Sequence, residues 1–352
     1  MTRRDFFGKL FNVSMLRLAL IGAGYWGKNL ARNALAQKDG ALQIICDRDP
    51  SRVEWMRAHY PHLRASGDWQ EVIADAEIEA VLVATPPSSH FEIVRAALSS
   101  GKHCFVEKPL AISSADALAL HELAKEKNLI LAVDHTFLFT GAVRKIKELI
   151  DIGELGRLRY FDSSRINLGL IQSDVNVIYD LAAHDVSILN YLTAERPNRV
   201  TAIGKSYVTA NSTRVEEVAH MMLDYPSGFL AHIHTSWLSP VKMRKILLGG
   251  DKKMVVYDDI EVSEKVRVHD SGAELDFSKE TPAMPFYRRG DVYIPKLDEE
   301  EALKGALEHF LKRIKEPLPS IIDGYHGYET VKILEACDQS LKNGNLPVSL
   351  SF

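Results

Sequence analysis

Three glycines form the spacing with the clearest chemical meaning in the chain. Gly22, Gly24 and Gly27 follow the apolar run 16–21, and a helical pattern opens at Tyr25. After a strand, such glycines permit a tight turn, let backbone N–H groups approach a pyrophosphate and let the helix pack on the sheet. The partial positive charge at the helix N-terminus attracts anions. The pattern predicts a dinucleotide site; a glycine-rich turn without a ligand is the alternative.

An acidic residue stands where a dinucleotide fold places its ribose acceptor. Asp47 ends the second apolar run, 20 positions after Gly27. A carboxylate there accepts hydrogen bonds from the adenosine ribose hydroxyls, and it repels a 2′-phosphate by roughly 1 to 4 kcal/mol at about 4 Å. Arg48 weakens this argument, because its guanidinium could cover the adenine or pair with a 2′-phosphate. We therefore expect NAD, with NADP as the alternative.

Polar residues also close two later apolar runs. Thr85 and Pro86 end one run, with His90 in the helical pattern that follows, and Glu107 and Lys108 end another. Ligands of open parallel sheets bind at the carboxyl ends of the strands, so these residues are expected at the nicotinamide end of a dinucleotide. Lys108 follows a buried run and stands beside Glu107, which makes it a candidate for a poised cation rather than an ordinary surface charge.

The first 135 residues alternate apolar runs with helical patterns. Runs that are apolar at nearly every residue indicate strands buried on both faces, and hence a parallel sheet. The expected strands are 16–21, 42–46, 80–85, 103–107 and 129–134. The expected helices are about 25–38, 50–59, 88–100 and 113–127. This alternation predicts an α/β fold with a doubly wound Rossmann domain over residues 15–135.

From residue 136 the pattern changes to an alternation of period two. Such alternation indicates strands with one wetter face and a largely antiparallel sheet. The expected strands lie within 158–166, 199–208, 220–226, 228–238, 245–250 and 253–259. The expected helices are 139–151, about 299–315 and 324–343. We therefore expect a second α/β domain over 136–352 with a large, mostly antiparallel open sheet, and with the C-terminal helices packing at the domain junction.

Composition argues against several classes of protein. The 352 residues carry 43 Lys and Arg against 47 Asp and Glu, without the basic stripe that nucleic-acid binding needs. No run of about 18 apolar residues suggests a membrane span. Three widely spaced cysteines favour a reduced, cytoplasmic setting. Residues 1–14 contain the paired arginines of an export signal but lack its apolar stretch, so we interpret them as a poorly ordered extension.

Four segments together resemble the Gfo/Idh/MocA oxidoreductase family. They are GAGYWG at 22–27, TPPSSH at 85–90, GKHCFVEKPL at 101–110 and DLAAHD at 180–185. The resemblance covers nearly the whole chain from residue 15. It implies an NAD(P)-dependent reaction at a hydroxyl or ketone of a sugar or cyclitol, with Tyr25 and Trp26 among the cofactor-binding residues. It also implies a homodimer or homotetramer formed through the open sheet of the second domain.

The same resemblance assigns catalytic roles. Lys108 matches the lysine of the family's EKP motif, which touches the nicotinamide ribose and the reacting oxygen, and Asp180 and His184 match its Asp-xxx-His pair. A spacing of four would place these two side chains together on one helix face. His184 is then suited to take the hydroxyl proton, Asp180 to orient it and Lys108 to stabilise the alkoxide. A helix-surface pair without a catalytic role is the alternative.

Further local patterns concern the substrate. His135 follows the last strand of the first domain, and Arg165 and Asn167 begin the segment RINLGL. These patterns resemble members acting on nucleotide-linked sugars, such as UDP-N-acetylglucosaminuronate 3-dehydrogenases, so the three side chains are expected to serve the substrate. The solvent face of a strand is the alternative for Arg165 and Asn167. A free-sugar or cyclitol dehydrogenase, an NAD-dependent glycosidase of the same fold and a non-catalytic ligand sensor are the alternative functions.

Two histidines have a spacing that zinc can use. His232 and His234 point to one face of an expected strand. No Cys or Glu stands at an obvious offset, and hydride transfer to nicotinamide needs no metal, so we expect no metal site. Trp237, Met221 and Met222 are interpreted as core or sheet-interface residues.

Overall fold

The chain divides into two compact units in a computed structural model that describes residues 15–209, 212, 214–275 and 285–352. The first unit runs to Ala111 and also contains Ala115–Asp134 and Leu303–Tyr325. The second contains Ile112–Ser114, His135–Ala302 and His326–Phe352. This division differs from the predicted single domain boundary after residue 135, because the segment 303–325 groups with the first unit. The expected N-terminal extension, 1–14, lies outside the described residues.

A six-stranded sheet forms the centre of the first unit. Its strands are β1 (Leu16–Ile21), β2 (Gly40–Cys46), β3 (Arg64–Ser66), β4 (Ala80–Val83), β5 (His103–Glu107) and β6 (Leu131–Asp134). They lie in the order β3-β2-β1-β4-β5-β6, and every neighbouring pair is parallel. The strand order reverses between β1 and β4, which is the position where open parallel sheets bind ligands.

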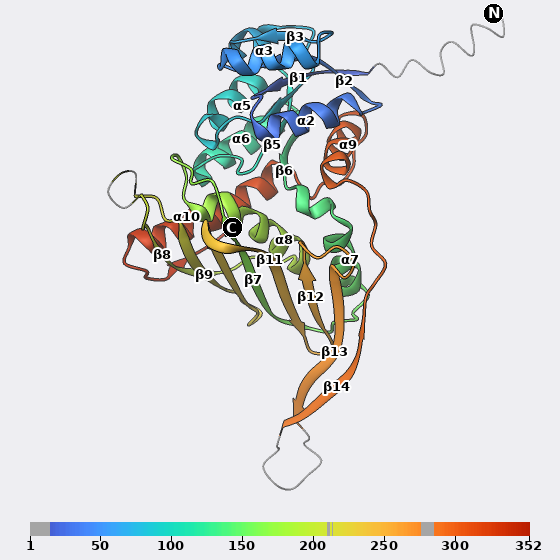
Figure 1. The fold of residues 1–352 in the computed structure, drawn as a ribbon, viewed down its shortest axis with the longest axis vertical. Coiled ribbons are helices and arrows are strands. Elements are labelled where there is room, and N and C mark those ends of the chain that lie inside the picture. Colours follow the sequence, from blue (N-terminus) through green and yellow to red (C-terminus); the bar gives the residue numbers. More distant parts are fainter. Residues whose placement is uncertain (1–14, 210–211, 213, 276–284) are drawn as a thin grey trace, which may run out of the picture. The chain divides into compact units, whose positions relative to one another are not determined.

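Helices cover both faces of this sheet (Figure 1). They are α2 (Tyr25–Leu35), α3 (Pro50–His59), α4 (Trp69–Ala74), α5 (His90–Ser99), α6 (Ser114–Glu126) and α9 (Ala302–Lys315), with a 3₁₀ turn at Pro87–Ser89. Because both faces are covered, most residues of β1, β4 and β5 are buried, as their continuous apolar runs predict. Phe310 on α9 packs against Phe105 on β5 with ring centroids 5.6 Å apart, which explains why residues 303–325 belong to this unit.

The second unit contains a nine-stranded sheet. Its strands are β7 (Leu158–Leu168), β8 (Arg199–Lys205), β9 (Val218–Asp224), β10 (Leu230–Ser236), β11 (Leu238–Gly250), β12 (Met254–Asp258), β13 (Val266–Leu275), β14 (Pro285–Tyr293) and β15 (Val348–Ser349). They lie in the order β14-β13-β12-β11-β7-β10-β9-β8-β15. The strands β7 and β10 pair in parallel, and the other neighbouring pairs of described strands are antiparallel.

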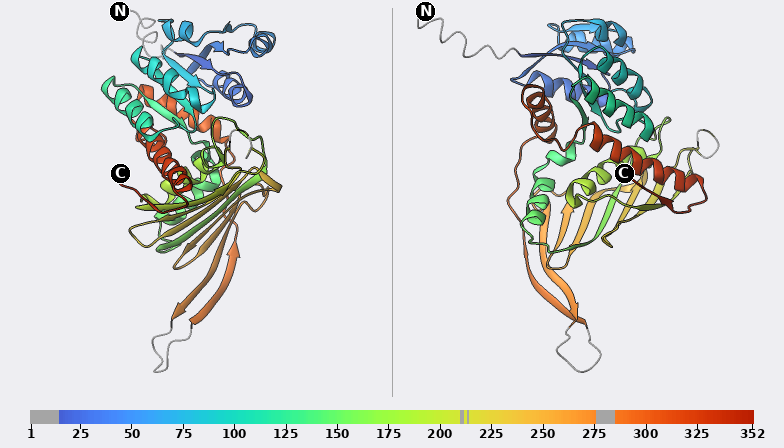
Figure 2. Two further views of the ribbon diagram at one scale, coloured as in Figure 1. Left: turned by 90° about the vertical axis from the view of Figure 1, so that its left-hand side faces the viewer. Right: turned by 180° about the vertical axis from the view of Figure 1, so that it is seen from behind.

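The described helices of this unit lie on one face of the nine-stranded sheet (Figure 2). They are α7 (Gly141–Asp151), α8 (Ala183–Thr193) and α10 (Gly324–Lys342), with a 3₁₀ turn at Thr136–Phe139 and a π-helical turn at Ile178–Ala182. Along β9 the side chains alternate between the two faces, so that Met221 is fully buried whereas Met222 is exposed. Met221 is therefore a core residue, whereas Met222 lies on the exposed face, where its role as a sheet-interface residue stays a prediction. Association of copies through the open face stays a prediction.

The predicted fold class is confirmed, with a parallel Rossmann sheet followed by a mostly antiparallel sheet. The sequence analysis missed the hairpin of β13 and β14, because charged residues and glycines interrupt the apolar alternation in VRVHDSGAEL and PFYRRGDVY. The short elements α4, β3 and β15 were not predicted either. Among the described residues, no helix combines the length and the apolar character that crossing a membrane requires.

Candidate active site

In the glycine turn after β1, Gly22 and Gly27 lie against backbone atoms, whereas Gly24 does not. Gly22 has a φ of +99°, and a Cβ there would lie 2.5 Å from the carbonyl carbon and oxygen of Ala84. A Cβ on Gly27 would lie 2.0 Å from the carbonyl oxygen of Gly22. A Cβ on Gly24, in contrast, would find Arg52 Nη1 as its nearest neighbour, at 3.6 Å. Gly22 and Gly27 therefore build the turn, and Gly24 leaves space next to it.

The helix that follows this turn presents its N-terminus without a side-chain cap. Gly24 is the N-cap residue of α2 and has no side chain that could accept a hydrogen bond from the first turn. The first N–H groups of a helix lack partners within the helix and carry a partial positive charge. Tyr25 and Trp26 flank this end and are 78% and 49% exposed. These features fit a pyrophosphate, so the residues present agree with the expected dinucleotide.

Asp47 is tied to the glycine turn by its own carboxylate. Its Oδ2 accepts a hydrogen bond from the backbone N–H of Ala23 at 2.7 Å, and its Oδ1 accepts one from the N–H of Asp49 at 2.9 Å. Arg52 Nη1 lies 3.3 Å from Oδ2. Oδ2 thus accepts from both Ala23 and Arg52, whereas Oδ1 has further acceptor capacity for a ribose hydroxyl. Exposed Arg48 lines, with Asp47, a cavity of about 240 Å³ at the start of α3.

His90 holds two turns of the first unit together. Its ring is fully buried, with Nδ1 2.8 Å from the carbonyl oxygen of Pro109 and Nε2 2.8 Å from that of Thr85. Both ring nitrogens face protein carbonyls, and the role of His90 in cofactor binding stays a prediction. Thr85 and Pro86 lie at the surface of the turn that His90 supports, and the Thr85 hydroxyl accepts a hydrogen bond from Ser89.

Two carboxyl groups lie side by side beneath Lys108. Glu107 and Asp134 are register partners at the ends of β5 and β6, and they are 8% and 1% exposed. Burial, and next the Asp134 carboxylate, raise the pKa of Glu107 well above its usual value, while the nearby Lys108 cation opposes the rise. The folded protein therefore favours the protonated form of Glu107. Half-buried Lys108 follows directly, at the carboxyl end of β5.

Asp180 and His184 lie where a π-helical turn passes into α8. Asp180 is in the turn Ile178–Ala182, and His184 is in the first turn of α8. Asn176 caps this segment, because its Oδ1 accepts hydrogen bonds from the N–H groups of Ile178 and Tyr179. The sequence analysis assumed one regular helix with both side chains on one face. The wider π turn changes that spacing, and π turns are frequent at functional sites.

A buried ion pair supports the ring next to His184. Arg165 on β7 donates from Nε to Asp185 Oδ2 at 2.7 Å and from Nη2 to Oδ1 at 3.2 Å, and its Cζ lies 4.5 Å from the centre of the Phe137 ring. The Phe137 ring packs edge-on against His184, with centroids 4.9 Å apart. Arg165 is 3% exposed, so the solvent-face alternative is wrong and its guanidinium is engaged with Asp185.

The other two predicted substrate residues differ in exposure. His135 is 1% exposed and precedes the 3₁₀ turn that carries Phe137, whereas Asn167 is half-buried near the end of β7. Both belong to the second unit, as do Asp180 and His184, whereas Lys108 belongs to the first.

Family models match both parts of the chain. Residues 16–135 match an oxidoreductase family with an NAD-binding Rossmann fold, and residues 143–256 match the C-terminal domain of the same family. The chain belongs to the Gfo/Idh/MocA family. The predicted membership, the oxidoreductase activity and the NAD-binding Rossmann domain are thereby confirmed.

Several Gfo/Idh/MocA relatives match most of the chain. UDP-N-acetylglucosamine 3-dehydrogenase of Acidithiobacillus ferrooxidans is 27% identical over 316 residues, 89% of this chain and 93% of that protein. Its solved structure has a TM-score of 0.79 at 23% identity, covering 94% of this chain and 99% of that chain. Myo-inositol 2-dehydrogenase of Thermotoga maritima is 26% identical over 339 residues, 93% of this chain and 96% of that protein.

A structure with a bound cofactor shares the fold. An oxidoreductase from Agrobacterium radiobacter in complex with NAD⁺, L-tartaric acid and magnesium has a TM-score of 0.77 at 20% identity, covering 96% of this chain and 98% of that chain. At such identity the likeness shows the Gfo/Idh/MocA fold alone. The sequence relatives place the chain in a family of sugar and cyclitol dehydrogenases.

Three histidines gather on the open face of the nine-stranded sheet. His232 Nδ1 lies 2.8 Å from Asp162 Oδ1 and its Nε2 lies 3.3 Å from His220 Nδ1, while the rings of His220 and His234 stack with centroids 4.1 Å apart. Burial, and then the neighbouring histidines, lower the pKa of His220 and of His234. Within the described residues, no group of three or more potential ligands has a geometry that could hold a metal ion.

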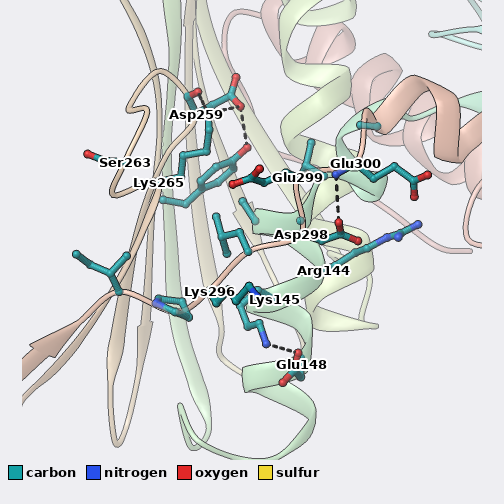
Figure 3. A pocket seen from close by; sticks show the side chains of 18 of the residues that line it. Arg144, Lys145, Glu148, Asp259, Ser263, Lys265, Lys296, Asp298, Glu299 and Glu300 are labelled. Carbon is teal, nitrogen blue, oxygen red and sulfur yellow. Dashed lines mark hydrogen bonds and ion pairs between the residues drawn. The ribbon is translucent and has the colours of Figure 1, made fainter. Parts of the chain in front are cut away.

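A cavity of about 1460 Å³ lies within the second unit, among α7, the turn after β12 and the segment 294–300 (Figure 3). Two of its lysines pair with carboxylates of the lining, Lys145 with Glu148 at 2.6 Å and Lys265 with Asp259 at 4.0 Å, and Tyr257 donates to Asp259 at 3.1 Å. The sequence analysis did not predict this cavity, and its lining residues differ from the predicted site residues. Because its cations are balanced by carboxylates, we assign no ligand to it.

Proposed function

We propose that this Gfo/Idh/MocA oxidoreductase uses NAD to oxidise a secondary hydroxyl of a nucleotide-linked sugar, or to reduce the corresponding ketone. The observation that carries the proposal is the glycine turn, in which Gly22 and Gly27 are packed against backbone while Gly24 and the uncapped N-terminus of α2 stay accessible. This arrangement fits the pyrophosphate of a dinucleotide. Asp47, adjacent to the turn, favours NAD because its carboxylate accepts from a ribose diol and repels a 2′-phosphate.

The reaction assigns one task to each of three side chains. When bound, the nicotinamide accepts or donates a hydride. His184 takes the hydroxyl proton of the substrate, a role suited to an imidazole and worth roughly 10² to 10⁴ in rate. Asp180 orients His184. The Lys108 ammonium stabilises the negative charge that develops on the substrate oxygen as the proton leaves.

The relatives support a proposal for the substrate class. The relative with 27% identity over 89% of this chain acts, by its name, on a UDP-linked amino sugar. We therefore propose a nucleotide-linked sugar as the substrate. A cyclitol is the second candidate, because the inositol dehydrogenase of Thermotoga maritima matches 93% of the chain at nearly the same identity. The three buried cysteines carry free thiols, which fits a reducing compartment such as the cytoplasm.

The proposal is tested by following NADH formation with UDP-N-acetylglucosamine, its uronate, the free sugars and myo-inositol. We expect turnover with a UDP-linked sugar and a kcat/KM at least about tenfold lower with the free sugars. Lys108→Ala should lose turnover by about 10² or more while NAD affinity stays within about tenfold, because the glycine turn holds the pyrophosphate.

The matched control is Lys127→Ala, which removes an exposed lysine of the same unit and should leave turnover unchanged. Turnover with myo-inositol alone would replace the nucleotide sugar by the cyclitol. Unchanged turnover in Lys108→Ala would remove this lysine from the mechanism.

A further inference from the structure

Trp237 connects the sheet of the second unit to Asp180. It lies between β10 and β11, is 1% exposed, and donates a hydrogen bond from its indole Nε1 to Asp180 Oδ2 at 2.9 Å. An indole N–H is a donor only, and a buried one needs an acceptor. The carboxylate of Asp180 is that acceptor, so the two residues are paired across the interface of the π turn with the sheet.

The backbone of Trp237 is fixed on both sides. Its N–H donates to the carbonyl oxygen of Glu217 at 2.9 Å, and its carbonyl oxygen accepts from the N–H of Gly169 at 2.9 Å. A Cβ on Gly169 would lie 3.0 Å from Trp237 Cδ1, so the absence of a side chain there leaves room for the indole. The position of the Trp237 indole and the direction of its N–H are therefore fixed.

The π-helical turn removes the regular helical spacing between Asp180 and His184. In a regular helix a spacing of four aligns two side chains, but Asp180 belongs to a widened turn and His184 to the α-helix after it. The backbone alone therefore does not aim the Asp180 carboxylate. A donor on rigid sheet backbone fixes the position of Oδ2, and a hydrogen bond to an ionised carboxylate is stronger than one between neutral groups.

We propose that Trp237 is a positioning residue of the active site, whose indole N–H fixes the Asp180 carboxylate in the orientation that His184 needs. The inference rests on the proposed function, in which Asp180 orients His184 and the substrate proton passes to the imidazole. Trp237 touches neither substrate nor cofactor in this scheme. Its effect is therefore expected in kcat, with little change in KM.

The test replaces the donor while keeping the aromatic ring. Trp237→Phe removes the indole N–H, and incorporation of benzothienylalanine at position 237 replaces that N–H by sulfur at nearly the same volume. We expect kcat to fall about tenfold in both, with KM and NAD affinity within about twofold of wild type. In an Asp180→Asn background, Trp237→Phe should add less than about twofold, because the two residues act as one unit.

Tyr257→Phe is the matched control. Tyr257 is also 1% exposed and also donates to a carboxylate, Asp259, in the same unit, but it lies outside the proposed machinery. It should leave kcat within about twofold. The indole N–H resonance absent from Trp237→Phe should shift in Asp180→Asn, which reports the hydrogen bond without any turnover.

Several outcomes distinguish a failure of the proposed role of Trp237 from a failure of the proposed function. A kcat within twofold of wild type in the benzothienylalanine protein overturns the role of Trp237, even when Trp237→Phe does not fold. A raised KM at unchanged kcat, or full additivity with Asp180→Asn, also overturns it. If Asp180→Asn itself keeps wild-type kcat, the proposed function of Asp180 fails, while an unaltered indole resonance in that variant contradicts the hydrogen bond alone.

Discussion

The two groups of site residues are built from different materials. In the first unit the glycine turn is shaped by backbone, since the space next to Gly22 and Gly27 is filled by carbonyl groups. In the second unit Asp180 and His184 are surrounded by side chains, namely Trp237, Phe137 and the pair of Arg165 with Asp185. A backbone-built site tolerates almost no added atom, whereas a side-chain-built site can be adjusted residue by residue.

The largest expected effect is the loss of folding caused by a substitution in the backbone-built glycine turn. Gly27→Ala should prevent the first unit from folding, because the new Cβ would overlap the Gly22 carbonyl and backbone cannot yield as a flexible side chain does. Gly24→Ala should fold with an unfolding free energy within about 1 kcal/mol of wild type but lose NAD affinity at least tenfold. Circular dichroism, urea unfolding and NAD titration measure the three quantities.

Gly67→Ala is the control for stability, because no atom lies within 4 Å of the added Cβ, and it should leave the free energy of unfolding unchanged. A folded Gly27→Ala protein, or a Gly24→Ala protein with wild-type NAD affinity, contradicts the division of tasks among the glycines.

The next effect tests the side-chain-built part. Arg165→Met leaves Asp185 as a buried charge without its partner and should lower the free energy of unfolding by about 3–5 kcal/mol. The double variant Arg165→Met with Asp185→Leu should recover most of that loss, because no unpaired charge is left. Urea unfolding of the three proteins is the measurement, and a loss below about 1 kcal/mol in the single variant would count against a buried ion pair.

The smallest effect concerns the raised pKa of Glu107, which lies next to Asp134. The folded protein raises the pKa of Glu107, so above pH 4.5 the unfolded chain binds fewer protons and stability falls as pH rises towards the folded pKa. The fall is at most about 1.4 kcal/mol per pH unit for one proton. Glu107→Gln, which mimics the protonated acid, should flatten this part of the stability profile.

Exposed Glu126 supplies the control, since Glu126→Gln should keep the wild-type slope of unfolding free energy against pH. An equal slope in Glu107→Gln and wild type would show that the buried pair does not hold a proton.

The contrast between the backbone-built and the side-chain-built part also explains which features of the site can be predicted from the sequence. The glycine spacing and the apolar runs of β1, β4 and β5 act locally, and they predict the turn, the parallel sheet and the position of Asp47. The roles of Arg165 and Trp237 depend on partners 20 and 57 positions away, so no spacing reveals them. The bonds of His90 to the carbonyls of Pro109 and Thr85, 19 and 5 positions away, are likewise not visible in its local pattern. The π turn was missed because hydrophobic periodicity does not distinguish it from an α-helix.

Residues 303–325 belong to the first unit although they follow most of the second unit in the chain, and this order has a consequence for biosynthesis. Phe310 covers Phe105, and Leu311 lies beside Gly40 at the start of β2, so the Rossmann core is completed by a helix that is synthesised only after β7 to β14. Until that helix leaves the ribosome, an apolar face of the nascent sheet has no cover and is open to chaperones and to aggregation. A fragment that ends at residue 135 lacks this helix, so the apolar face of its sheet stays uncovered.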